Sequence, residues 1–71
     1  QMCIRDREIF KTIRSVSVRL GYTFMIIEHR YDILFQYAEY IFLLNEGSLA
    51  AEGTPTQLLN NPVLGQVYLG E

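Results

Sequence analysis

Residues 23–27, with the sequence Thr-Phe-Met-Ile-Ile, constrain the fold of this chain more than any other stretch. The run is rich in residues that favour β-strands. On such a strand, Phe24 and Ile26 face one side. Met25 and Ile27 face the other, so both sides are apolar. A strand of this kind belongs in the middle of a parallel sheet with helices on each face, and residues 23–27 therefore predict an α/β fold.

His29 comes just after this predicted strand. In open α/β sheets, binding sites lie outside the carboxyl ends of the strands. From the spacing alone, a solvent-exposed or capping histidine in a loop is as good an interpretation as a functional one. If the strand continues, Glu28 cannot form a carboxylate–imidazole pair with His29, because consecutive strand side chains point to opposite faces. A metal site is not predicted either, because the chain has one histidine and one cysteine.

Helical periodicity flanks the predicted strand on both sides. The apolar positions before it recur at i, i+4, i+7 and i+11: Ile9, Ile13, Val16 and Leu20. This spacing predicts a helix over 8–20, which Gly21 ends. A second stripe predicts a helix over 31–39, and its members are interpreted as core residues: Tyr31, Leu34, Phe35 and Ala38. Residues 1–7 lack such alternation and are interpreted as an N-terminal extension of the kind that sequence assembly can introduce.

The second half of the chain predicts a β-hairpin followed by two capped helices. Residues 41–44 form a strand of the buried type, Asn-Glu-Gly at 45–47 supplies the turn, and residues 48–52 return. This hairpin is expected at the edge of the sheet.

Thr54 predicts the start of the first of these helices, with Pro55 at the first helical position and Gln57 completing a capping box. The Asn-Pro pair at 61–62 repeats this device before a last helix over 63–69.

Length and composition limit the functions that this chain can have. Its 71 residues make at most one small domain, and 49% of them are hydrophobic. The net charge of −2 and the absence of a basic run argue against binding of nucleic acid. No apolar run approaches the roughly 20 residues that span a bilayer, and Cys3 has no partner for an internal disulfide.

Four segments together resemble a known family. They are Phe-Met-Ile-Ile-Glu-His-Arg-Tyr-Asp-Ile at 24–33, Tyr-Ile-Phe-Leu-Leu-Asn-Glu-Gly at 40–47, Ala-Glu-Gly-Thr-Pro at 51–55 and Val-Tyr-Leu-Gly-Glu at 67–71. The first resembles the switch-histidine segment of ATP-binding cassette (ABC) ATPases, and the others follow in the family's order. The last segment narrows the resemblance to the ATP-binding subunits of branched-chain amino-acid importers, with lipopolysaccharide-export ATPases next. Arg30 and the Ala-Glu-Tyr at 38–40 depart from the family's commoner Asp and Ala-Asp-Arg.

The resemblance implies that residues 8–71 are the C-terminal segment of a nucleotide-binding domain, a partial P-loop ATPase fold of the α/β class. Its parent would couple ATP hydrolysis to uptake of branched-chain amino acids and would need ATP and Mg²⁺. The implied partners are a second ATPase subunit and transmembrane permease subunits, at the cytoplasmic face of the membrane. His29 corresponds to the switch histidine, which contacts the γ-phosphate. The resemblance assigns no other nucleotide-binding residue and no metal ligand to this chain.

The sequence lacks the family's main phosphate-binding element. Its only lysine is Lys11, and no glycine-rich loop ends in Gly-Lys-Ser/Thr. The Walker B and signature segments are also absent, so we expect the 71-residue chain alone to be inactive. The alternative is a free-standing α/β interaction module without catalysis. Because the family's intervening strand is missing, residues 23–27 and 41–44 are expected to pair directly in parallel.

Overall fold

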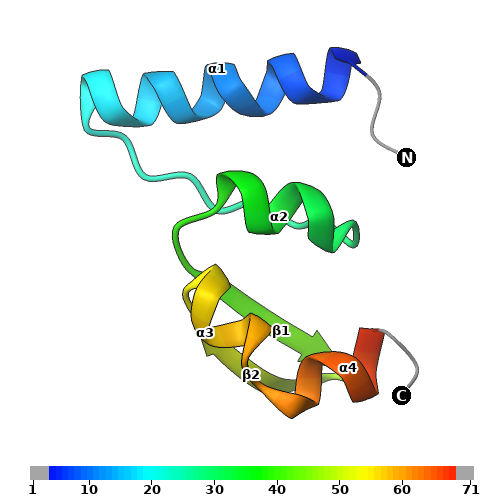
Figure 1. Cartoon of the computed structure of the whole chain (residues 1–71). Coiled ribbons are helices and arrows are strands. Elements are labelled where there is room, and N and C mark those ends of the chain that lie inside the picture. Colours follow the sequence, from blue (N-terminus) through cyan, green and yellow to red (C-terminus); the bar gives the residue numbers. More distant parts are fainter. Residues whose placement is uncertain (1–3, 69–71) are drawn as a thin grey trace. The chain divides into compact units, whose positions relative to one another are not determined.

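The computed structural model describes residues 4–68, and the chain divides between Tyr37 and Ala38 into two compact units. The elements of the first unit are α1 (Ile4–Leu20) and α2 (Tyr31–Tyr37) (Figure 1). Those of the second are β1 (Ile41–Asn45), β2 (Ser48–Gly53), α3 (Pro55–Leu59) and α4 (Pro62–Tyr68). Within the described residues, no helix has the length and apolar character needed to cross a membrane.

The helix α1 begins at Ile4, one turn earlier than the predicted start at residue 8. Residues 4–7 are therefore part of this helix, and the predicted start at residue 8 is wrong. A negative charge favours this earlier start, because Asp6 in the first turn complements the helix dipole. Gly21 ends the helix as predicted, with φ of 71° and its N–H donating to the Ser17 carbonyl at 2.9 Å.

No residue of α1 is buried, although its apolar stripe predicts a helix that covers a sheet. Ile13 and Val16 are half-buried, whereas Ile9 is exposed. One contact that α1 makes in its own unit is with α2. The Phe10 and Tyr37 rings stack with centroids 5.9 Å apart, which holds the two helices together through aromatic contact.

Residues 23–27 do not form a strand, which corrects the central prediction from the sequence. Their apolar side chains are largely in solvent, with Met25 86% and Ile27 98% exposed. Direct parallel pairing with 41–44 is also wrong, because β1 pairs with β2 alone within the described residues. A strand requires a partner for its backbone N–H and C=O groups. In a hairpin, the partner strand lies only a few residues away in sequence. Parallel pairing of 23–27 with 41–44 would require a long crossover connection, whose closure costs conformational entropy.

The buried residue of α2 is Ile33, which is fully inaccessible to solvent. The predicted core stripe is therefore only partly correct. Leu34 and Phe35 are half-buried, but Tyr31 is 42% exposed and packs its ring edge-on against Phe35 at 6.0 Å. The helix ends at Tyr37, two residues before the predicted end.

The hairpin of β1 and β2 is the whole sheet of the described chain, rather than the edge of a larger one. Its strands are antiparallel, with Ile41 opposite Gly53 and Asn45 opposite Ser48. Between them, Glu46 (φ 50°) and Gly47 (φ 80°) form a two-residue turn in which both residues have positive φ. The register shifts between Leu43 and Leu44, where the partner strand carries one extra residue.

The strand β1 is buried on one side only. Ile41 and Leu43 are buried, while Phe42 and Leu44 are 53% and 63% exposed. The prediction of a strand buried on both sides is wrong here, because a two-stranded sheet has helices to cover one face at most.

The helix start at Thr54 matches its prediction in each contact. The Thr54 side chain accepts from the Gln57 N–H at 3.2 Å, and the Gln57 side chain accepts from the Thr54 N–H at 2.8 Å. Before α4, the Asn61 side chain accepts from the Val63 N–H at 2.9 Å. Leu58 and Leu64 from these two helices are buried and complete the core of the second unit. Leu69, in the predicted last helix, lies outside the described residues.

Candidate functional site

His29 lies in a bend between the extended segment 22–28 and the start of α2. Its side chain is 91% exposed, so the imidazole has no packing neighbours that would restrict access by a ligand. Its main chain, in contrast, is fixed by the residues on either side of it.

The Glu28 carboxylate organises this bend. Its Oε1 accepts hydrogen bonds from the backbone N–H of His29 at 2.9 Å and of Arg30 at 3.2 Å. The same carboxylate also accepts from the Arg30 guanidinium, through Nε at 3.1 Å and Nη2 at 2.8 Å. Four donors therefore hold one side chain that is only 11% exposed. The His29 Nδ1 lies 3.5 Å from Glu28 Oε1, a close electrostatic contact that is longer than a typical hydrogen bond.

Arg30 connects this bend to the first turn of α1. Its Nη1 donates to Asp6 Oδ2 at 2.8 Å, so one guanidinium bridges two carboxylates. The Arg30 and Asp6 side chains are each 32% exposed, so water screens their pair less than it screens a fully exposed one. We refer to Asp6, Glu28, His29 and Arg30 as the His29 cluster.

The charges of the His29 cluster shift its acid–base equilibria. Hydrogen bonds from the Arg30 side chain lower the pKa of Glu28 from 4.5 to about 2, against a smaller opposing effect of burial. The same bonds, together with the one to Asp6, raise the pKa of Arg30. The Glu28 carboxylate is therefore ionised across the neutral range.

Sequence reasoning identified one member of this cluster and missed the rest. The predicted strand would turn the Glu28 side chain away from His29, and the sequence assigns no role to Arg30. Since residues 23–27 are not a strand, that geometric objection does not apply. Asp6 was missed because residues 1–7 were excluded. An acidic residue close before a periodic helix is the signal that could have found it.

No group of three His, Cys, Asp or Glu side chains converges anywhere in residues 4–68. Phosphate binding in the family that the sequence resembles requires many backbone N–H donors and a lysine in a glycine-rich loop, and the sequence contains no such loop. His29 is the one residue here that the resemblance places at a nucleotide.

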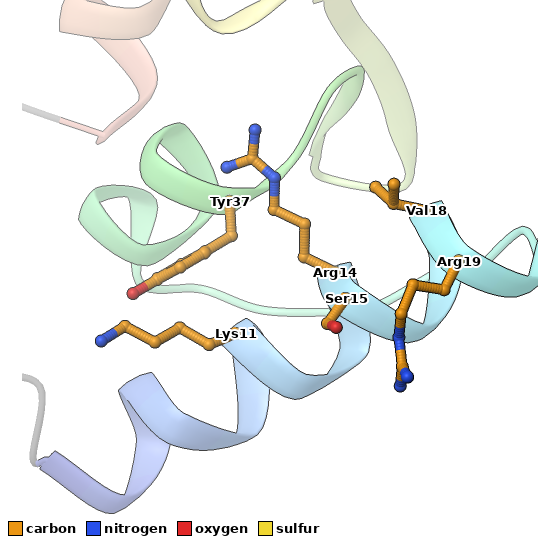
Figure 2. Close-up of a pocket in the computed structure, with 6 residues that line it drawn as sticks. All are labelled: Lys11, Arg14, Ser15, Val18, Arg19 and Tyr37. Atoms are coloured by element: carbon orange, nitrogen blue, oxygen red, sulfur yellow. The ribbon is translucent and has the colours of Figure 1, made fainter.

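A second feature of the first unit is a shallow hollow beside α1, shown in Figure 2. Its lining combines three cations with small and aromatic side chains: Lys11, Arg14, Ser15, Val18, Arg19 and Tyr37. The Tyr37 hydroxyl is buried without a hydrogen-bond partner among the described atoms. Arg14 and Arg19 extend away from each other, so their charges do not converge on one point (Figure 2). We assign no ligand to this hollow.

Comparison of the sequence with known proteins finds relatives that are all named as ATP-binding proteins of transporters. The chain is 44% identical over 52 residues to a probable branched-chain amino acid transport ATP-binding protein LivG of Archaeoglobus fulgidus, covering 73% of this chain and 20% of that protein. The high-affinity LivG protein of Escherichia coli is 32% identical over 65 residues, 92% of this chain and 26% of that protein. An energy-coupling factor transporter ATP-binding protein EcfA1 of Methanospirillum hungatei is 41% identical over 58 residues, 82% of this chain and 21% of that protein.

Over most of its length, this chain matches part of the sequence of ABC transporter ATP-binding proteins. It spans about a fifth to a quarter of the length of these relatives. No protein-family model matches the chain. No solved structure gives a significant match either, so the assignment to ABC proteins rests on sequence alone.

Proposed function

We propose that this chain is the C-terminal segment of the nucleotide-binding domain in an ABC transporter ATP-binding subunit, with residues 8–71 as the family segment. The whole protein couples ATP hydrolysis to uptake of branched-chain amino acids. The observation that carries this proposal is the match to LivG proteins of both an archaeon and a bacterium across 73% and 92% of the chain. The whole protein binds ATP with Mg²⁺ and works with a second ATPase subunit and transmembrane permease subunits, on the cytoplasmic face of the membrane.

In this proposal, His29 is the residue that contacts the γ-phosphate of ATP. Two observations support it. The sequence around His29 resembles the switch-histidine segment, and the imidazole is 91% exposed on a main chain that Glu28 fixes. An exposed imidazole on a backbone held by hydrogen bonds can reach a phosphoryl group and the water molecule beside it.

A second candidate is supported by the match to EcfA1. An ATP-binding subunit of an energy-coupling factor transporter fits the 41% identity over 58 residues about as well as a LivG-type subunit does. The two candidates predict different permease partners and different cargo. Uptake of labelled leucine by cells that carry or lack the intact gene separates them, because only the LivG-type function requires leucine uptake to fall.

The test of the His29 role uses the complete reading frame that carries this segment. First, DNA upstream of residue 8 should encode an in-frame phosphate loop and Walker B segment; their absence would contradict the proposal and favour a free-standing module. Second, His29→Ala in the full-length protein should leave ATP binding nearly unchanged and slow hydrolysis by about 10²–10³. Single-turnover hydrolysis and equilibrium nucleotide binding separate these two effects.

The matched control for His29→Ala is Thr12→Ala, an exposed position on α1 away from the His29 cluster. This variant should hydrolyse ATP at the wild-type rate. Wild-type turnover by the His29 variant, or equal loss in both variants, would show that His29 has no direct role.

A further inference from the structure

The Glu28 carboxylate is held more tightly than the imidazole beside it. Both of its oxygens are engaged, Oε1 by two backbone N–H groups and Arg30 Nε, and Oε2 by Arg30 Nη2. Arg30 in turn is tied to Asp6 of α1 at 2.8 Å. A carboxylate oxygen is thus fixed at a defined place, 3.5 Å from His29 Nδ1.

We propose that Glu28 is a positioning residue for His29, which favours the tautomer protonated at Nδ1 and leaves Nε2 as an exposed acceptor. A neutral imidazole carries one N–H, and the partner of one nitrogen determines which nitrogen bears it. A carboxylate beside Nδ1 attracts an N–H there and repels a lone pair. Asp6 contributes indirectly, because it holds the Arg30 side chain that orients the Glu28 carboxylate.

The chemical consequence rests on the proposed function. With its proton on Nδ1, His29 presents the Nε2 lone pair outward, where it can accept a hydrogen bond from a water molecule beside a phosphate. The other tautomer, with its proton on Nε2, would instead donate from that nitrogen to a phosphate oxygen. Glu28 would thereby determine whether the neutral imidazole accepts or donates at its exposed nitrogen. The tautomer itself can be measured without nucleotide, so this inference can fail or hold independently of ATP hydrolysis.

The experiment uses the 71-residue chain with ¹⁵N-labelled histidine, observed by NMR at about pH 9, where an ordinary imidazole is neutral. The imidazole ¹⁵N shifts give the ratio of the Nδ1–H to the Nε2–H form. We expect this ratio in the native chain to exceed that in about 8 M urea. In Glu28→Gln it should fall about two- to fivefold, the scale of an exposed charge contact. Asp6→Asn should lower it less.

The matched control is Glu8→Gln, which removes a carboxylate from the same helix that Asp6 occupies. Glu8 lies 3.8 Å from Lys11 and belongs to an exposed pair away from His29, so this variant should leave the ratio unchanged. An equal shift in Glu8→Gln and Glu28→Gln would overturn the proposal. If Glu28→Gln loses the α2 structure, the comparison of native and urea-unfolded wild type decides. Equal ratios in those two states would also overturn it.

Discussion

The two units of this chain differ in charge and in core. All six Lys and Arg residues lie in the first unit, before residue 38, and none lies in the second. Of the five buried hydrophobic side chains in the described structure, only Ile33 belongs to the first unit. The other four are Ile41, Leu43, Leu58 and Leu64. The first unit is therefore held chiefly by ion pairs and ring contacts, and the second by apolar burial.

This contrast shows which interactions a short sequence can satisfy by itself. The second unit is built from a two-residue turn, a capping box and neighbouring helices, all of them local in sequence. The first unit contains the 23–27 segment, whose apolar residues need distant partners and stay exposed. The four predictions below test the contrast with two sets of substitutions in each unit.

The largest effect is expected in the core of the second unit. Leu58 is 1% exposed, and Leu58→Ala should lower the free energy of unfolding by about 2–5 kcal/mol through lost burial and a cavity. Its neighbour Leu59 is 62% exposed, so Leu59→Ala should change stability little. Urea denaturation followed by circular dichroism measures both. Equal destabilisation by the two variants would contradict a core centred on Leu58.

A smaller effect is expected when acid titrates Glu28 in the first unit. Because its pKa is lowered from 4.5 to about 2, its stabilising contribution is fully present above about pH 4.5 and is lost as pH falls toward 2. The contribution should be about 1–3 kcal/mol. The amide shifts of His29 and Arg30 report it, and they should titrate in this window in the wild type only. A titration that persists in Glu28→Gln would assign the effect to another group.

A loss of about 1 kcal/mol is expected from removal of the cap on α3. Thr54→Ala removes the oxygen that accepts from the Gln57 N–H, a contact of the kind that contributes about 0.5–2 kcal/mol. Gly53→Ala should act on the same motif, because an added Cβ would lie 2.6 Å from Gln57 Oε1. Thr56→Ala on an exposed position of the same helix is the control. Thermal melts compare the three variants.

The smallest effect is expected in the exposed segment. Ile27 is 98% exposed, so Ile27→Thr should change the free energy of unfolding by less than about 0.5 kcal/mol. The same substitution at the fully buried Ile33 should cost several times more. Urea denaturation curves of the two variants measure both losses in free energy of unfolding. A large loss at Ile27 would show that residues 23–27 are buried in a strand after all.

The candidate site was only partly predictable from the sequence. His29 was identified from its place after an apolar run and from the family resemblance, and its role remains a prediction. Glu28 could not be assigned, because the predicted strand would point its side chain away from His29. The bridge from Arg30 to Asp6 joins residues 24 positions apart, a separation that no local pattern reveals.

By itself, the sequence determined the elements whose hydrogen bonds close within a few residues. The Gly21 end of α1, the turn at Glu46 and Gly47, and the Thr54 cap all formed as predicted, because each signal and its partner lie within one turn or hairpin. Only the tertiary structure decided that residues 23–27 do not form a strand and that the Glu28 carboxylate accepts hydrogen bonds from Arg30 and from the His29 N–H. An apolar run becomes a strand only beside another strand, and a charged side chain takes the orientation of the partner that the fold brings to it.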